Sequence, residues 1–296
     1  TVSTSVFTTS STIVPTSTLD AAPGGAPPWL IPPPLLADDQ LARLYLALLA
    51  IGAALAVISL ASQMRAPTPY GRHASREPAW GPQVPRRLAH ALANGLPGVG
   101  LFLWLYIATY QSLGLTPTVV GGALLLLWLA HFVHRGLVHP LVTRYGARAL
   151  PLELGLSALV PLTIFATLNA LAIAAMPYPD AWFSSPYFLI GALLFAVGFV
   201  LNRHADRALR QLRPPGGRDY AIPRGGLFEW VSSPNYLGEL IMWIGWSLAT
   251  WTAAGAVWTL YVAATLVPRA RDHHLWYQER FSDYPARRRA LIPFTW

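Results

Sequence analysis

The sequence predicts an all-α membrane protein with seven transmembrane helices, and two observations indicate this fold class. The 296 residues are 54% hydrophobic and only 11% charged, with a mean hydropathy of +0.41. A soluble domain has about 25% charged residues, so this composition cannot cover a water-exposed surface. The second observation is a series of apolar stretches, each close to the roughly 20 residues that cross a bilayer core.

These apolar stretches give the expected helices in chain order. The last two are short and are separated by little more than Thr252, so one long bent helix is the alternative for that pair. The predicted spans are residues 41–63, 92–112, 115–134, 150–176, 186–203, 235–251 and 253–268.

The distribution of arginines tests the number of spans. All 21 basic residues are Arg, and all except Arg43 fall in alternate gaps between spans or in the C-terminal tail. Cytoplasmic loops carry an excess of basic residues, so the pattern predicts an outside N-terminus and an inside C-terminus. Six or eight spans would break the alternation. We therefore attribute the net charge of +8 to topology and expect no nucleic-acid partner.

Two parts of the chain differ in composition: a Ser/Thr/Pro-rich tail over residues 1–38 and a membrane domain over residues 39–296. Prolines exclude a helix from the end of the tail, which is expected to be disordered alone in water. We expect other subunits of a membrane assembly to hold this tail and to pack on the apolar helix faces. Because the chain begins at Thr1 rather than Met, a removed targeting segment is also expected.

The chemistry-bearing residues favour an anionic ligand over a metal ion. The chain has no cysteine, and the pairs His131/His134 and His273/His274 lack the carboxylates and spacing of zinc or di-iron sites. We therefore expect no metal site. Arginines with histidines suit a phosphate-bearing cofactor. No Gly-x-Gly-x-x-Gly fingerprint follows a strand, so a Rossmann domain is not expected.

Two long motifs carry a family resemblance. Residues 222–249 read IPRGGLFEWVSSPNYLGELIMWIGWSLA, and residues 269–294 read RARDHHLWYQERFSDYPARRRALIPF. Both resemble the C-terminal domain of the steroid 5α-reductase (3-oxo-5α-steroid 4-dehydrogenase) family. The resemblance extends back over about residues 65–296, through the segments NRHADRALRQLR, HFVHR and YGRH.

The resemblance implies a seven-helix membrane fold that binds NADPH from the cytosolic side, largely through residues 150–296. It also implies hydride transfer to the β-carbon of an enone such as a 3-oxo-Δ4 steroid. Carried over by position, the implied cofactor contacts are Asn202, Asp206, Arg213, Tyr220, Asn235, Glu239, Arg269, His273 and Tyr277, with Arg135 in support.

The implied catalytic positions depart from the family. Where the family has a tyrosine in its third-span motif, this chain has Phe132. Where it has Gln-Glu before Leu-Pro, this chain has Asn94-Gly95, or Ala93-Asn94 in a shifted register. A further acid is replaced by Met242. We therefore expect no catalytic residue at these positions, and Tyr106, Tyr110 or His90 as the possible substitutes.

These departures leave three hypotheses about function. The first is a degenerate, non-catalytic accessory subunit of a larger assembly that can still bind NADP(H). A mitochondrial inner-membrane respiratory complex is the favoured home and a photosynthetic membrane the next. The alternative is an active NADPH-dependent 3-oxo-Δ4-steroid 5α-reductase of the endoplasmic reticulum or a bacterial membrane. The third is a protein that binds a sterol or lipid in its cavity without turnover.

Overall fold

The computed structural model is a bundle of long helices, and it describes residues 33, 35, 36, 39–67, 73, 82–143, 149–212 and 220–296. Two π-helical segments, η3 (Ala91–Leu101) and η4 (His134–Val138), continue α-helices without a break. A short antiparallel pair, β1 (Gln83–Pro85) and β2 (Ala149–Pro151), joins the starts of α2 and α6. The α-helices are α1 (Asp39–Arg65), α2 (Arg86–His90), α3 (Phe102–Ser112), α4 (Val119–Val133), α5 (His139–Val142), α6 (Leu152–Ala175), α7 (Pro186–Gln211), α8 (Pro234–Thr250) and α9 (Ala253–Arg280).

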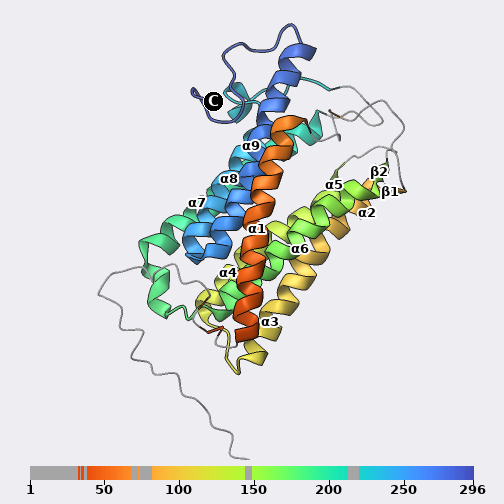
Figure 1. Ribbon diagram of the computed structural model, residues 1–296. Coiled ribbons are helices and arrows are strands. Elements are labelled where there is room, and N and C mark those ends of the chain that lie inside the picture. The colour runs from red at the N-terminus through yellow and green to blue at the C-terminus, as the bar shows by residue number, and fades with distance from the viewer. Residues whose placement is uncertain are drawn as a thin grey trace, which may run out of the picture.

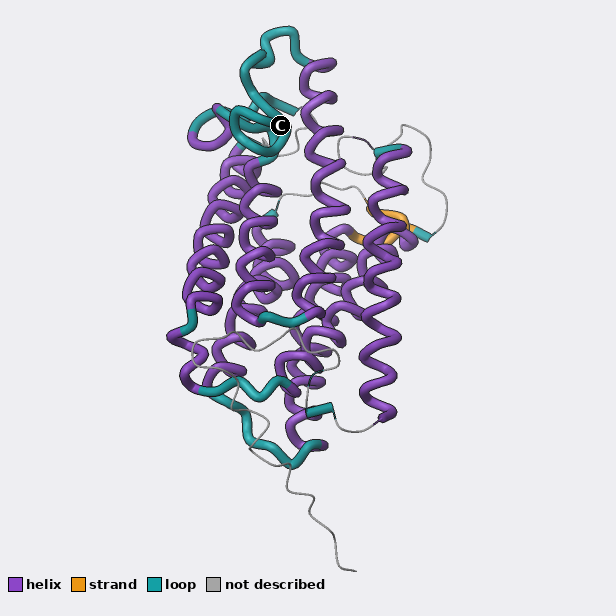
Figure 2. Tube along the Cα trace, turned by 60° about the vertical axis from the view of Figure 1, so that its left-hand side comes forward, coloured by secondary structure: helices purple, strands orange, loops and turns teal. Residues whose placement is uncertain are grey.

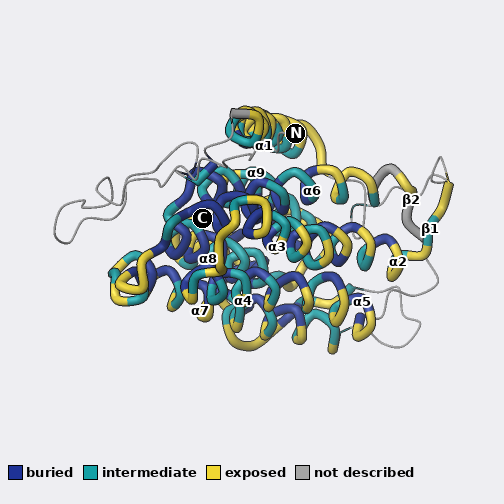
Figure 3. The backbone as a smooth tube through the Cα atoms, turned by 90° about the horizontal axis from the view of Figure 1, so that it is seen from below, coloured by how far each residue is buried: buried dark blue, intermediate teal, exposed yellow. Residues whose placement is uncertain are grey.

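The helices form two groups. Figure 1 shows α7, α8 and α9 side by side, α2, α3 and α6 on the other side of the bundle, and α1 across the front. The long helices run along one common direction and the loops gather at the two ends (Figure 2). Seen along that direction, α1 lies at the edge and is largely exposed, whereas buried residues concentrate around α3, α8 and α9 (Figure 3).

Five helical segments of the described chain are long and apolar enough to cross a membrane: Gln40–Arg65, Arg86–Ser112, Val119–Val142, Gly155–Ala175 and Pro186–Gln211. They coincide with the first five predicted spans. Exposed leucines, isoleucines and valines on α1 are expected where a helix faces lipid. The chain is therefore an integral membrane protein. The two further spans and the orientation stay predictions, because α8 and α9 are not among these five segments.

The residues of the last two predicted spans form two helices rather than one bent helix. α8 ends at Thr250, and Trp251 takes a left-handed backbone conformation with φ 48°. Thr252 then caps α9, because its Oγ1 accepts a hydrogen bond from the backbone N–H of Gly255 at 3.1 Å. Such a cap satisfies one of the free N–H groups at a helix start.

Glycines let α7 and α8 approach closely. A Cβ at Gly238 would lie 2.5 Å from the backbone N of Asn202, and a Cβ at Gly245 would lie 2.5 Å from the carbonyl O of Gly191. Small residues of this kind bring membrane helices into backbone contact. The contact fixes how the polar residues of α7 face those of α8.

Tryptophans fill the centre of the bundle. The Trp128 ring lies 5.6 Å from Trp243, 5.2 Å from Trp246 and 6.0 Å from Trp258, measured between centroids. Nε1 of Trp128 donates a hydrogen bond to the carbonyl O of Gly98 at 2.9 Å. This aromatic cluster joins α4, α8 and α9 to η3, and its Trp258 also lines the candidate site.

Candidate cofactor and substrate cavity

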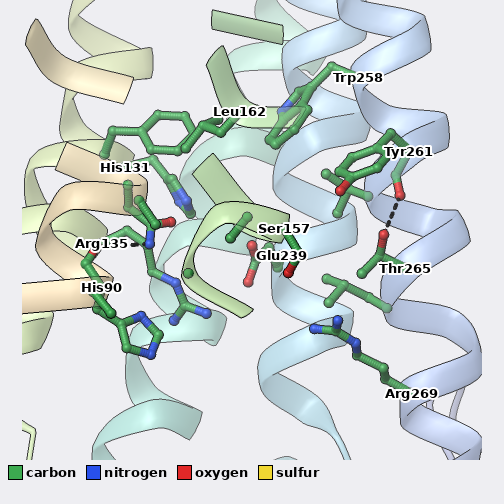
Figure 4. Close-up of a pocket in the computed structure, with 18 residues that line it drawn as sticks. His90, His131, Arg135, Ser157, Leu162, Glu239, Trp258, Tyr261, Thr265 and Arg269 are labelled. Carbon is green, nitrogen blue, oxygen red and sulfur yellow. Dashed lines mark hydrogen bonds between the residues drawn. The ribbon is translucent and has the colours of Figure 1, made fainter. Parts of the chain in front are cut away.

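A cavity of about 250 Å³ lies between η3, α4, α6, α8 and α9. Figure 4 shows Arg135, Glu239 and Arg269 toward one end and Leu162 and Trp258 toward the other. Ligand sites commonly combine an apolar wall with a few polar groups that fix the ligand's orientation. The cavity has this combination.

One face of α9 forms a wall of the cavity. Residues spaced three and four apart lie on the same side of a helix, so this whole face points inward. The lining residues of α9 are Trp258, Tyr261, Val262, Thr265, Leu266 and Arg269.

A hydrogen-bonded network lies at the polar end. Nδ2 of Asn202 donates to the carbonyl O of Asn235 at 2.8 Å and to Oε2 of Glu239 at 3.3 Å. Nδ2 of Asn235 donates to Oδ1 of Asp206 at 3.3 Å. Nη1 of Arg135 donates to Oδ2 of Asp206 at 3.4 Å, which joins η4 to α7. Asn202 is only 1% exposed, so the network is part of the packed interior.

The structure brings six of the predicted cofactor residues together. Five belong to this network, and the sixth, Arg269, lines the same cavity as Arg135 and Glu239. The six are Arg135, Asn202, Asp206, Asn235, Glu239 and Arg269.

The remaining predicted residues lie outside this network. Nε2 of His273 lies 3.2 Å from the hydroxyl of Tyr236 on α8. Tyr220 packs edge-on against the ring of Trp276, 5.1 Å between centroids. Arg213 lies outside the described residues.

Tyr277 has a structural environment. It is 1% exposed, and its ring stacks on Tyr284 with centroids 5.2 Å apart. Tyr284 belongs to the C-terminal segment, which folds back on α8 through a hydrogen bond from the backbone N of Ser232 to the O of Arg289 at 2.8 Å. As a cofactor contact, Tyr277 stays a prediction.

The polar end fits an anionic ligand rich in hydrogen-bonding groups. Nδ1 of His134, Nε of Arg203 and Nη1 of Arg210 are buried without a hydrogen-bond partner among the described residues. Arg203 lies near the positive charges of Arg135 and Arg210 and near the negative charges of Asp206 and Glu239. Buried donors and positive charges of this kind are costly unless an anion or water meets them. The phosphates and ribose hydroxyls of a dinucleotide would satisfy them.

An aromatic ring lines the cavity at the position where the resemblance implies a tyrosine. Phe132 is 2% exposed and lines the cavity, and its ring lies 4.7 Å from Trp128 and 6.4 Å from Trp258. A Cβ at Gly98 would overlap this ring. The backbone of η3 therefore packs directly on Phe132.

Gly95 has a different role, because it is not among the residues that line the cavity. A Cβ at Gly136 would lie 2.5 Å from the Cα of Gly95, so η3 and η4 meet backbone to backbone at this point. Its neighbours Ala93 and Asn94 do line the cavity, and Nδ2 of Asn94 donates to the O of His90 at 3.0 Å. Met242 is fully buried in the core.

Of the three predicted substitutes for the missing donors, only His90 lines the cavity. Tyr106 and Tyr110 are each 3% exposed, and their hydroxyls approach Gly121 near the start of α4. Three further polar side chains that line the cavity were not among the residues predicted from the sequence: Ser157, Tyr261 and Thr265. Spacing would have found two of them, because Tyr261 and Thr265 lie eight and four residues before Arg269 on one helix face.

Comparison with known proteins bears on this site. The family model for 3-oxo-5-alpha-steroid 4-dehydrogenase matches residues 153–296. The 3-oxo-5-alpha-steroid 4-dehydrogenase 1 of Rattus norvegicus is 39% identical over 268 residues, which cover 88% of this chain and 99% of the rat protein. The Homo sapiens protein of the same name is 36% identical over 253 residues, 85% of this chain and 95% of its own length. Human 3-oxo-5-alpha-steroid 4-dehydrogenase 2 is 37% identical over 241 residues, 80% and 91% respectively.

Proposed function

The chain belongs to the 3-oxo-5-alpha-steroid 4-dehydrogenase family, and on that premise we propose that it uses NADPH to reduce an enone of the 3-oxo-Δ4 steroid class within the membrane. The names of its relatives point to this substrate class, and the resemblance of its motifs points to the cofactor. The comparisons confirm the family that the two C-terminal motifs predicted.

One observation supports the proposal above the others: the polar network and an apolar wall share a single cavity. Glu239 and Arg269 line it from the polar side, and Phe132, Trp258 and Leu162 line it from the apolar side. A membrane-soluble ring compound can bind against the aromatic and aliphatic side chains beside a cofactor held at the polar end.

The residues of the polar end fit NADPH, which would supply a hydride when bound. Arg135 and Arg269 would hold its phosphates, since a guanidinium pairs with two phosphate oxygens at once. Asn235 and Glu239 would meet its amide and hydroxyl groups, because they present both donors and acceptors.

The remaining task of the chain is to meet the negative charge that develops on the ketone oxygen. A donor aimed at that oxygen is typically worth a factor of about 10²–10³ in rate. Phe132 has no such donor, so the donor must be another residue of the cavity.

A test of the proposal uses the purified chain in lipid nanodiscs. We expect NADPH to bind and a 3-oxo-Δ4 steroid to be converted to the saturated ketone, detected by mass spectrometry with matching NADPH oxidation. Arg135→Ala should weaken NADPH binding about tenfold or more, because a charged hydrogen bond contributes roughly 1.5–3 kcal/mol. Arg224→Ala is the matched control, since Arg224 is 59% exposed in a surface ion pair with Asp283. Absence of both binding and product in the unmodified chain would refute the proposal.

A second function, dinucleotide and sterol or lipid binding without turnover, is favoured by the packing of the wall. Phe132 and Gly95 are built into close contacts with Gly98 and Gly136, so the departures from the family are part of the fold. In that case the chain would bind NADPH normally and yield no product.

The accessory-subunit role and the mitochondrial inner membrane stay predictions of the sequence. Both predictions depend on protein partners of the tail over residues 1–38. The structure describes only residues 33, 35 and 36 of that tail. Blue-native electrophoresis of mildly solubilised membranes would test them, because a subunit migrates with its assembly and a lone enzyme does not.

A further inference from the structure

We propose that the phenol of Tyr261 is the group that donates a proton to the ketone oxygen of the substrate. The inference rests on the proposed function and deepens it, because it names a donor where the family position holds Phe132. It follows from the geometry of the cavity and from the competing interactions of the other polar side chains there.

Tyr261 is placed for this role by the face of α9 that lines the cavity. It lies between Trp258, one turn before it, and Thr265, one turn after it, and all three line the cavity. Figure 4 shows its ring projecting from α9 toward the interior, on the side of Ser157 and Glu239. Its ring is fixed by Phe165, at 4.8 Å between centroids.

Tyr261 and Phe132, which stands where the resemblance implies a tyrosine, both pack against Trp258. Between ring centroids, Trp258 lies 6.4 Å from Phe132 and 6.0 Å from Tyr261. A phenol therefore lines the cavity from α9, although the position on α4 has none.

Two hydroxyls near the phenol support it rather than compete with it. Oγ1 of Thr265 donates to the backbone O of Tyr261 at 2.9 Å and lies 2.7 Å from Oγ of Ser59. The first of these bonds ties the backbone of Tyr261 to the next turn of α9. As aliphatic alcohols, Thr265 and Ser157 are much weaker acids than a phenol, whose ordinary pKa is near 10.

Two other polar side chains of the cavity are less suited to donate. Oε2 of Glu239 already accepts a hydrogen bond from Nδ2 of Asn202. His131 is 2% exposed, and its Nδ1 faces Nη2 of Arg203 at 3.4 Å. A neutral imidazole beside a guanidinium presents an acceptor to it, and a second positive charge there would be repelled.

The proton step balances as follows. When the enone takes a hydride at its β-carbon, the electron pair of the C=C bond moves toward the ketone oxygen. The O–H bond of Tyr261 breaks as an O–H bond forms on that oxygen, which gives an enol and a phenolate. The enol then returns its O–H proton to the phenolate of Tyr261, and solvent water supplies a proton to the α-carbon, which gives the saturated ketone and regenerates the phenol. The net addition is one hydride and one solvent proton.

Ligand binding tests the donor without turnover. In the presence of NADP⁺, we expect the unmodified chain to bind a 3-oxo-Δ4 steroid about two- to tenfold more tightly than its 3-deoxy analogue, the range of one net hydrogen bond. Tyr261→Phe should remove this preference. Tyr106→Phe should keep it, because that phenol lies outside the cavity. Equilibrium dialysis with labelled steroids measures all six affinities, two for each of the three chains.

Turnover gives a second readout. Tyr261→Phe should lower kcat by about 10²–10³ and change KM much less, because the donor acts on charge that develops in the transition state. An unchanged preference for the 3-oxo steroid together with unchanged kcat in Tyr261→Phe would overturn this inference and leave the proposed function standing. An unmodified chain that neither binds nor reduces the steroid would overturn both.

Discussion

The α7–α8 contact beside the cavity and the η3–α4 wall of the cavity use glycine for different purposes. In α7 and α8, Gly198 and Gly238 bring the backbones together, and the polar side chains of Asn202 and Glu239 meet just beyond that contact. In η3 and α4, Gly98 makes room for the ring of Phe132. The α7–α8 contact positions hydrogen-bonding side chains, and the η3–α4 contact positions an aromatic ring.

The difference shows which part of the site is strictly specified. Each polar group of the α7–α8 network depends on its neighbours for a partner, so one substitution leaves another buried group unpaired. The aromatic wall depends on shape alone, and shape tolerates substitution better than a buried polar network does. The family's dinucleotide side is therefore expected to persist while its substrate side diverges.

The largest effect is expected at the helix contact itself. Gly238→Ala would place a Cβ 2.5 Å from the backbone N of Asn202, so α7 and α8 must separate. We expect a loss of about 1–3 kcal/mol in the free energy of unfolding, measured by thermal denaturation in detergent. Gly100→Ala is the matched change on η3, where nothing lies within 4 Å of the added Cβ. It should be neutral or stabilising by up to about 1 kcal/mol, and equal losses in both variants would contradict this account.

Much of this arrangement could be predicted from the sequence, because its causes are local. Each of the seven apolar stretches falls on a helix, since length and apolar composition decide whether a segment can be helical in lipid. The π-helical form of η3 could not be predicted, because it accompanies a tertiary contact between Gly95 and Gly136. Tyr261 was missed for a similar reason: its spacing places it on the helix face of Arg269, but spacing by itself does not tell a cavity wall from a lipid-facing surface.

The next effect compares two asparagines, one on each side of the cavity. Asn202→Ala removes the donor to Asn235 and Glu239, so the network loses its alignment. We expect NADP⁺ affinity to fall about tenfold, in the range of two lost hydrogen bonds. Asn94→Ala removes only a bond to the O of His90 on the same helix, and affinity should change less than about twofold. Isothermal titration calorimetry on both variants measures the contrast, and a larger loss in Asn94→Ala would reverse our assignment of the two sides.

A smaller effect is expected from pH on thermal stability, through the C-terminal segment that is hydrogen-bonded to Ser232 just before α8. The pKa of His274 lies below its ordinary value of 6.5, because burial disfavours the imidazolium and because Arg288 and Arg289 repel it. Its Nδ1 lies 2.6 Å from Oγ of Ser232, the residue that ties the C-terminal segment to the start of α8.

The sign of the pH dependence follows from that lowered pKa. As pH falls, His274 is protonated in the unfolded chain before it is protonated in the folded chain. The stability of the folded chain with a neutral His274 is therefore complete above pH 6.5 and is lost as pH decreases toward the folded pKa. We expect the Tm of the unmodified chain to fall between about pH 7 and pH 5, and His274→Gln to flatten that fall. An identical slope in the variant would show that other groups cause it.

The smallest effect on turnover is expected at Phe132, although the resemblance to the family suggests the largest effect at that position. Phe132→Tyr restores the family's phenol on a ring that already lines the cavity. If Tyr261 meets the ketone oxygen, a second phenol across Trp258 has no charge to stabilise, and kcat should change by less than about threefold. If the cavity lacks a donor, the same hydroxyl should raise turnover by about 10²–10³. The rate of this one variant, measured as saturated ketone formed per mole of chain, therefore separates an enzyme with a relocated donor from a protein that binds its ligands without turnover.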